Sequence, residues 1–333
     1  MNYDIYSLAS ALVDIVFNID QKFISFLEDQ GIQKGSMTLV DEKEQTRLIQ
    51  KLIDEGNEPL IACGGSSTNT TIAASNFGAK CFINCKISND HYGEIFLKDL
   101  EDNKISHNIY PKNSSIPSGR CLVMVSEDAD RTMCTHLGIS TQLNVGDINK
   151  EDIYNSNYLF IEGYLVTSPD NFKACIQAVK YAKESDTKLV LSLSDSNVVK
   201  NFRDEIEEII DHECDVIFCN LSEAYQYTKK SSTEEAIKLI SKKSKKTLIT
   251  LGPEGCIATN NEAIYRIPGC AVKAIDTNGA GDLFAGSVLF CLSRGMNLDI
   301  AAKFGCVVSS KGVEKIGPRL EKDDLLEIKT NFL

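Results

Sequence analysis

The sequence predicts an α/β fold: a doubly wound, mostly parallel sheet lying between helices, with a small β-sheet lid. Short, continuously apolar runs recur with helical segments between them, which is typical of parallel strands covered on both faces. Two other stretches of strand character lack a helix long enough for a crossover, which indicates antiparallel strands. We therefore expect a single domain, residues 1–333, that consists of an α/β core and a lid.

The core is expected to comprise about 1–10, 43–105 and 137–333. It starts with a strand at "YDIYSL", and paired apolar positions one turn apart predict a helix in "DEKEQTRLIQKLIDEG" with Asp41 as its N-cap. A strand at "PLIA" leads into a glycine turn and a helix at "GGSSTNTTIAASNFGA", and a helix over about 92–103 follows the strand "KCFINCKIS". The later strands are "NYLFIEG", "KLVLSLS", "CDVIFCN" and "KTLITLG".

The lid is expected to comprise about 11–42 and 106–136. Its first part pairs "ALVDIVFNI" with "GSMTLV". Its second part runs from "SHNIY" to "RCLVMVSEDADRTMCTH", in which the acidic turn "SEDADR" predicts a hairpin.

Composition excludes several classes of partner. The net charge of −12 opposes binding to nucleic acid or to an anionic membrane, so any bound phosphate must be held by local donors.

Twelve dispersed cysteines without a CxxC pair predict reduced core thiols in a cytosolic protein. The sequence has no signal-like start and no apolar run near 18 residues, which predicts a cytoplasmic location. None of the four dispersed histidines is assigned a catalytic or metal-binding role.

The stretch "AIDTNGAGDLFAGSVLF", residues 274–290, predicts a site for phosphoryl chemistry. Glycine at a helix start costs roughly 1 kcal/mol per residue against alanine, so bare backbone must be needed there. A glycine turn opening a helix presents several N–H groups and the positive end of the helix dipole to an anion. Asp282 in this turn is placed to accept a proton from a hydroxyl. A plain helix start, with Asp282 compensating the dipole, remains open, whereas a dinucleotide fingerprint would need glycine where Phe284 stands.

"DTNGAGDLFAG" together with "CGGSSTNT" resembles the PfkB carbohydrate kinases, also called the ribokinase family, which include adenosine kinases and ribokinases. An N-x-x-E and a T-x-G-x-x-G follow strands in the family's order, so the resemblance covers nearly the whole chain. It implies a kinase that transfers the γ-phosphate of ATP to a primary alcohol, with a central sheet between helices and a β-sheet lid.

The resemblance implies a role for each matched position. Asp282 is the catalytic base, and the backbone of Gly279, Ala280 and Gly281 forms the anion hole. The residues implied to bind the acceptor are Asp14, which would accept from vicinal hydroxyls, and Gly64, Gly65 and Asn69. Two alternatives stay open, a solvated lid position for Asp14 and a bond to its own backbone for Asn69.

On the nucleotide side, Asn220 and Glu223 match a pair that organises water, Mg²⁺ and phosphate in the family, although they also fit a helix cap. The other matches, Thr250, Gly252 and Gly255, would contact ATP or form an ordinary tight turn. No set of side chains is assigned as direct metal ligands.

Arg131, at the start of a lid strand, would reach the transferring phosphate on lid closure, or else pair with Asp128 or Asp130 at the surface. Residues 312–318 fall where some family members hold a monovalent cation such as K⁺.

The early motif "GGSSTNT" is similar to the GGS-x-x-N of adenosine kinases, which favours a nucleoside acceptor phosphorylated at its 5′-hydroxyl, adenosine first. The alternatives are a sugar kinase of the same family and a non-catalytic nucleotide or nucleoside sensor. The sequence leaves open whether the protein is a monomer or a homodimer.

Overall fold

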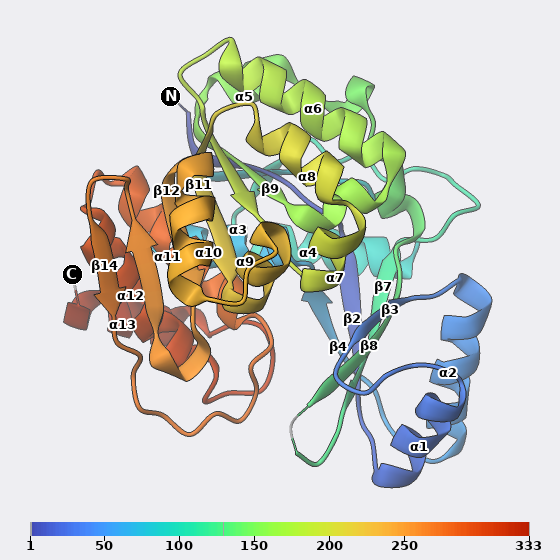
Figure 1. Cartoon of the computed structure of the whole chain (residues 1–333). Helices are drawn as coiled ribbons and strands as arrows, with labels where there is room; N and C mark the ends of the chain where they lie inside the picture. Colours follow the sequence, from blue (N-terminus) through green and yellow to red (C-terminus); the bar gives the residue numbers. More distant parts are fainter. Residues whose placement is uncertain (1, 129, 333) are drawn as a thin grey trace.

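A large sheet organises the chain (Figure 1). Within residues 2–128 and 130–332, which the computed structural model describes, its nine strands lie in the order β14-β13-β12-β11-β10-β9-β1-β5-β6. Neighbours from β6 to β12 pair in parallel, whereas β13 and β14 pair antiparallel at one edge. The predicted mostly parallel sheet is confirmed. The strands are β1 (Tyr3–Leu8), β5 (Cys81–Asn84), β6 (Ser106–His107), β9 (Ser156–Glu162), β10 (Lys188–Ser192), β11 (Cys214–Asn220), β12 (Ser244–Thr250), β13 (Cys256–Thr259) and β14 (Ile264–Ile267).

Helices cover both faces of this sheet because neighbouring strand residues are apolar on opposite sides. Ile5 belongs to the core under α3, α4, α11, α12 and α13, whereas Tyr6 belongs to the core under α5 to α10. The helices of the first face are α3 (Ser66–Asn76), α4 (His91–Asp102), α11 (Ala280–Ser293), α12 (Leu298–Gly312) and α13 (Lys322–Phe332). Those of the second are α5 (Lys150–Tyr154), α6 (Pro169–Lys183), α7 (Ser196–Asn201), α8 (Arg203–Ile210), α9 (Leu221–Thr228) and α10 (Thr233–Ile240).

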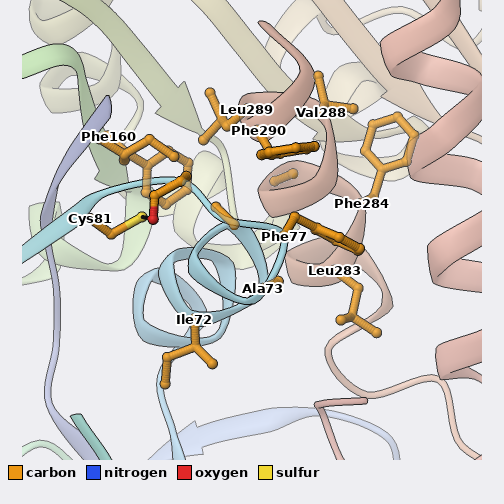
Figure 2. Close-up of a cluster of buried hydrophobic side chains, with 14 of the residues drawn as sticks. Ile72, Ala73, Phe77, Cys81, Phe160, Leu283, Phe284, Val288, Leu289 and Phe290 are labelled. Atoms are coloured by element: carbon orange, nitrogen blue, oxygen red, sulfur yellow. Dashed lines mark hydrogen bonds between the residues drawn. The ribbon is translucent and has the colours of Figure 1, made fainter. Parts of the chain in front are cut away.

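Helix α11 is apolar almost all round, and residues 283–292 are buried along it. It packs closely on α3, because a Cβ at Gly286 would lie 2.4 Å from the Thr70 carbonyl oxygen. The aromatic rings of Phe77 and Phe290 meet in the same cluster, with centroids 5.6 Å apart (Figure 2). This contact places the first turns of two helices from distant parts of the sequence next to each other.

A second sheet, in the order β3-β8-β7-β2-β4, projects to one side together with two helices (Figure 1). Its elements are β2 (Leu12–Asn18), α1 (Gln21–Asp29), β3 (Met37–Leu39), α2 (Glu42–Asp54), β4 (Leu60–Gly64), β7 (Gly119–Val125) and β8 (Arg131–His136). The predicted hairpin is confirmed, since β7 and β8 pair antiparallel. Ala129, in its turn, lies outside the described residues.

Strand pairing corrects the expected boundary of the lid. Residues 43–64 were assigned to the core, but Leu48 and Leu52 of α2 pack in the small sheet's own apolar cluster and β4 pairs antiparallel with β2. A short apolar run such as β4 does not indicate which of two sheets it joins. Strand β6, assigned to the lid, pairs with β5 in the large sheet.

Lid pairing also differs from the expectation. The expected antiparallel pairing of 11–19 with 35–40 was wrong, because β3 pairs in parallel with β8, and helix α1 lies between β2 and β3. Strand β2 pairs in parallel with β7, since the chain runs through the core between them.

Local expectations are confirmed elsewhere. Asp41 caps α2 by accepting a hydrogen bond from the Glu44 N–H at 2.8 Å, and α4 matches the expected helix over 92–103. All twelve cysteines are free, and Cys270 alone among them is more than marginally exposed in the part of the chain described. No helix among the described residues is long and apolar enough to cross a membrane.

Candidate active site

A cavity of about 350 Å³ lies between the small sheet and the carboxyl ends of the large sheet's strands. The predicted residues that line it are Asp14, Gly65, Asn69, Asn220, Glu223, Thr250, Gly279, Gly281 and Asp282. Five predicted residues do not contribute to the lining in the described structure: Gly64, Arg131, Gly252, Gly255 and Ala280. Residues more than 250 positions apart in the sequence thus meet around one volume.

The start of α11 forms one wall of this cavity. Gly279, the N-cap, has a left-handed backbone with φ 71°, and a Cβ there would lie 2.3 Å from the Pro318 carbonyl oxygen. Among the described residues, no atom outside the local chain lies within 4 Å of the position that a Cβ would take on Gly281, which lines the cavity. Glycine is therefore present at these two positions for different reasons. At Gly279 the backbone is left-handed and passes close to Pro318, whereas at Gly281 the space beside the backbone is open.

Backbone donors at this helix start are available to a ligand. The N–H groups of Gly279, Gly281 and Asp282 have no hydrogen-bond partner among the residues that the structure describes. The N–H of Ala280, by contrast, donates to the Thr277 carbonyl at 3.3 Å, which differs from the expectation that it is free. Free N–H groups at a helix N-terminus favour an anion.

Asp282 is held by two side chains from the start of α3. Its Oδ1 accepts a hydrogen bond from the Ser66 hydroxyl at 2.7 Å, and its Oδ2 accepts one from the Asn69 amide at 3.0 Å. Desolvation raises the pKa of Asp282, whereas these two hydrogen bonds and the charge of Arg319 act to lower it. The predicted alternative for Asn69, a bond to its own backbone, is not what this side chain makes.

Asp14 lies across the cavity on β2 and is buried. Burial raises the pKa of Asp14 to about 7, opposed by the charges of Arg319 and Arg131. Its carboxylate accepts no hydrogen bond from the side chains or backbone groups of the described residues, and a Cβ at Gly64 would lie 2.3 Å from its Oδ1. Gly64 therefore makes room for this carboxylate, which is left with unpaired acceptor sites facing the cavity.

Glu162, at the carboxyl end of β9, was not predicted as a site residue from the sequence. Its Oε1 accepts from the Ser10 N–H at 2.7 Å and its Oε2 from the Ser67 N–H at 2.6 Å, so it ties the end of β1 to the start of α3. Burial raises the pKa of Glu162 to about 7. An acidic residue closing the apolar run "NYLFIEG" was a usable signal, since polar groups at such strand ends gather around ligands.

On the other side of the cavity, Asn220 and Glu223 form the predicted helix cap. Asn220 Oδ1 accepts from the Glu223 N–H at 2.8 Å, and Glu223 Oε2 accepts from the Asn220 N–H at 3.0 Å. Burial raises the pKa of Glu223 to about 7. Both line the cavity with Thr250, whereas Gly252 and Gly255 form the turn beyond it.

Arg131 is buried but does not face the cavity. Its Nε donates to Asp276 Oδ1 at 2.6 Å, and its Nη2 contacts the other oxygen of the same carboxylate. Asp276 also accepts from the Asn278 N–H at 2.9 Å and from the Gly317 N–H at 2.6 Å. The lid arginine thus binds the loop that enters α11, rather than Asp128 or Asp130 at the surface. A monovalent cation near 312–318 stays a prediction.

Comparison with known proteins identifies the chain. The sequence profile described as "pfkB family carbohydrate kinase" matches residues 35–324, most of its length. The chain belongs to the pfkB family of carbohydrate kinases. As a pfkB-family kinase it is a phosphotransferase, and the predicted family and enzyme class are confirmed.

The relatives of this pfkB-family kinase include proteins named for a nucleoside acceptor and proteins named for a sugar acceptor. The solved adenosine kinase from Sinorhizobium meliloti is 28% identical with a TM-score of 0.90, over 99% of this chain and 98% of that one. A probable sugar kinase from Rhizobium etli CFN 42 is 26% identical with a TM-score of 0.92, over 100% and 99%. The ribokinase of Mus musculus is 27% identical over 74% of this chain and 76% of its own. The ribokinase-like fold is therefore confirmed.

Proposed function

We propose that this kinase transfers the γ-phosphate of ATP to the 5′-hydroxyl of a nucleoside, with adenosine as the first candidate, and that Asp282 is the base. The observation that carries the proposal is the placement of Asp282. Its carboxylate, fixed by Ser66 and Asn69, lies in one cavity with unpaired N–H groups at a helix start and with the unpaired carboxylate of Asp14. A base beside an anion cradle is what phosphoryl transfer to an alcohol requires.

In this proposal each group has one task. Asp282 takes the proton as the acceptor oxygen attacks the γ-phosphorus and the bond from that phosphorus to the bridging oxygen of ADP breaks. The free N–H groups of Gly279, Gly281 and Asp282 stabilise the transferring phosphoryl group. A protein of net charge −12 needs such local donors to hold a polyphosphate.

Residues on the nucleotide side fit a Mg²⁺–ATP complex. Asn220 and Glu223 line the cavity and carry amide and carboxylate oxygens, the ligand types that Mg²⁺ prefers, and these oxygens also accept the hydrogen bonds of the helix cap. No group of three or more acidic, histidine or cysteine side chains that could hold a metal occurs among the described residues. Mg²⁺ usually keeps several waters and binds few protein ligands directly. When bound, Mg²⁺ neutralises charge on the phosphates.

The lid supports a nucleoside over a simple sugar. Apolar side chains from its strands line the cavity on the side of Asp14: Leu12, Met37, Leu39 and Met133, with Leu137 just beyond β8. A flat nucleobase would bury against such a wall, while Asp14 accepts hydrogen bonds from a ribose diol. A free sugar would leave this wall in contact with water. The sugar kinase and ribokinase relatives keep a sugar acceptor as the second candidate.

The test is ADP production with Mg²⁺–ATP and a panel of adenosine, other nucleosides, ribose and fructose. We expect adenosine to give the highest kcat/KM, and a sugar in that place would favour the second candidate. Asp282→Asn should lower kcat by roughly 10²–10⁴-fold. The matched control is Asp299→Asn, because Asp299 occupies the first turn of α12 without lining the cavity. Full turnover in Asp282→Asn would refute the assignment of the base.

A further inference from the structure

Arg319 is a charged residue near the site to which the motifs gave no role. It lies between α12 and α13, and its side chain is 19% exposed. Its Nη1 donates to both carboxylate oxygens of Asp99 in α4, at 2.9 and 2.7 Å. Its Nε donates to Oδ1 of Asn69 in α3 at 2.7 Å. The guanidinium is therefore fixed between two helices, and one of its contacts is the residue that holds Asp282.

These contacts decide which end of the Asn69 amide faces Asp282. A guanidinium only donates hydrogen bonds, so the atom of Asn69 beside Nε must be the carbonyl oxygen. The amide NH₂ then points the other way, where it donates to Asp282 Oδ2 at 3.0 Å. Without Arg319, the Asp282 carboxylate would be the one remaining contact that selects this amide orientation, and the donor would be held less firmly.

Charge reinforces this geometry. The charge of Asp282 acts to raise the pKa of Asp14 on β2, of Glu162 at the end of β9 and of Tyr164 just after it, so two carboxyl groups and one phenol lie within electrostatic range of Asp282. The positive charge of Arg319 acts to lower the pKa of both Asp282 and Asp14, against desolvation. Asp99 in turn offsets part of the Arg319 charge.

We propose that Arg319 is a positioning residue for phosphoryl transfer, acting through Asn69 to aim an amide donor at Asp282 while its charge, tempered by Asp99, opposes the surrounding carboxylates. This inference rests on the proposed role of Asp282. A hydrogen bond from Asn69 stabilises the carboxylate over the carboxylic acid, which favours the form of Asp282 that can receive a proton.

The test is a titration that needs no substrate. In protein labelled with ¹³C at the aspartate carboxyl carbons, the NMR signal missing from Asp282→Asn reports Asp282. Arg319→Met should raise the Asp282 pKa by about 1 or more, because a nearby opposite charge and an aimed donor are both lost. Asp99→Asn should lower it, because the Arg319 charge is then less offset. Arg294→Met is the matched control, since Arg294 pairs with Asp4 away from the cavity.

Opposite shifts in Arg319→Met and Asp99→Asn are the decisive result, because loss of local packing alone would not change sign between the partners. Shifts in the same direction, or no shift, would overturn the inference. Should Arg319→Met fail to fold, Arg319→Lys is the second variant, because lysine keeps the positive charge but lacks the planar guanidinium that bonds Asn69 and Asp99 together. An Asp282 pKa equal to that of wild type in both Arg319→Lys and Asp99→Asn would also overturn the inference. The acid limb of the kcat profile with adenosine should follow the titrated pKa. If Asp282→Asn keeps full turnover, the proposed base fails, whatever the titration gives.

Discussion

Gly279→Ala provides a direct test of why the loop before α11 is bare backbone. An alanine would have to adopt the left-handed conformation with φ near 71°, which costs about 1–2 kcal/mol. Its Cβ would lie 2.3 Å from the Pro318 carbonyl oxygen and 2.6 Å from the Pro318 Cα. The loop must then open by about 1 Å to reach ordinary contact, and overpacking of this kind costs about 1–3 kcal/mol.

The free energy of unfolding of Gly279→Ala should therefore fall by about 2–5 kcal/mol, a large part of the ~5–15 kcal/mol of a typical protein. Urea unfolding followed by circular dichroism measures it, with the slope against urea checked for equality with wild type.

Gly281→Ala is the matched control. In the part of the chain that the structure describes, no atom outside the local chain lies within 4 Å of its added Cβ, and its backbone needs no left-handed φ. Its stability should rise by up to ~1 kcal/mol, while kcat falls because the new methyl group enters the cavity. A Gly279→Ala variant within about 0.5 kcal/mol of wild type would refute the steric argument.

Further predictions concern titration, thiols and the lid. Burial raises the pKa of Glu162 from 4.5 to about 7, so the folded protein holds this proton more tightly than the unfolded chain, and stability is lost as pH rises between these values. Urea unfolding from pH 4.5 to 8 should show that the free energy of unfolding of Glu162→Gln increases relative to that of wild type as the pH rises. A difference between the two proteins that stays constant with pH would contradict this. With a thiol reagent, one thiol should react rapidly in the native protein and twelve in denaturant, and Cys270→Ser should remove the native reaction; rapid native labelling of other thiols would argue against the buried positions. Asp276→Ala should cost about 3–5 kcal/mol of unfolding free energy, because it leaves the buried Arg131 guanidinium unpaired, and Arg131→Met should restore much of it; no recovery in the double variant would rule out that explanation.

Local patterns predicted most elements of the large sheet. Strand runs such as "KLVLSLS" are apolar on both faces, and the Asp41 cap is a hydrogen bond between residues three apart. Both features can therefore be predicted from a short segment of the sequence. The glycine turn before α11 was equally local, because the helix start that it forms needs only neighbouring residues.

The pairing of strands that lie far apart in the sequence could not be predicted from such short segments. Strand β4 is apolar enough for either sheet, and its partner β2 lies more than 40 residues away, so its assignment to the core was wrong. Helix α1 and the parallel pairing of β3 with β8 were missed for the same reason, since no short window indicates which strands become neighbours.

The sequence by itself determined the family, the alternation of strands and helices, and the glycine turn that carries Asp282. Only the tertiary structure decided what surrounds that carboxylate. Ser66 and Asn69 reach it from α3, more than 200 residues away, and Arg319 orients Asn69 from beyond α12. The tertiary structure also shows that the Arg131 guanidinium pairs with Asp276, a partner that the sequence did not indicate. The physical reason is that hydrogen bonds and ion pairs act over about 3 Å, and a single chain fixes such distances only after its helices have packed.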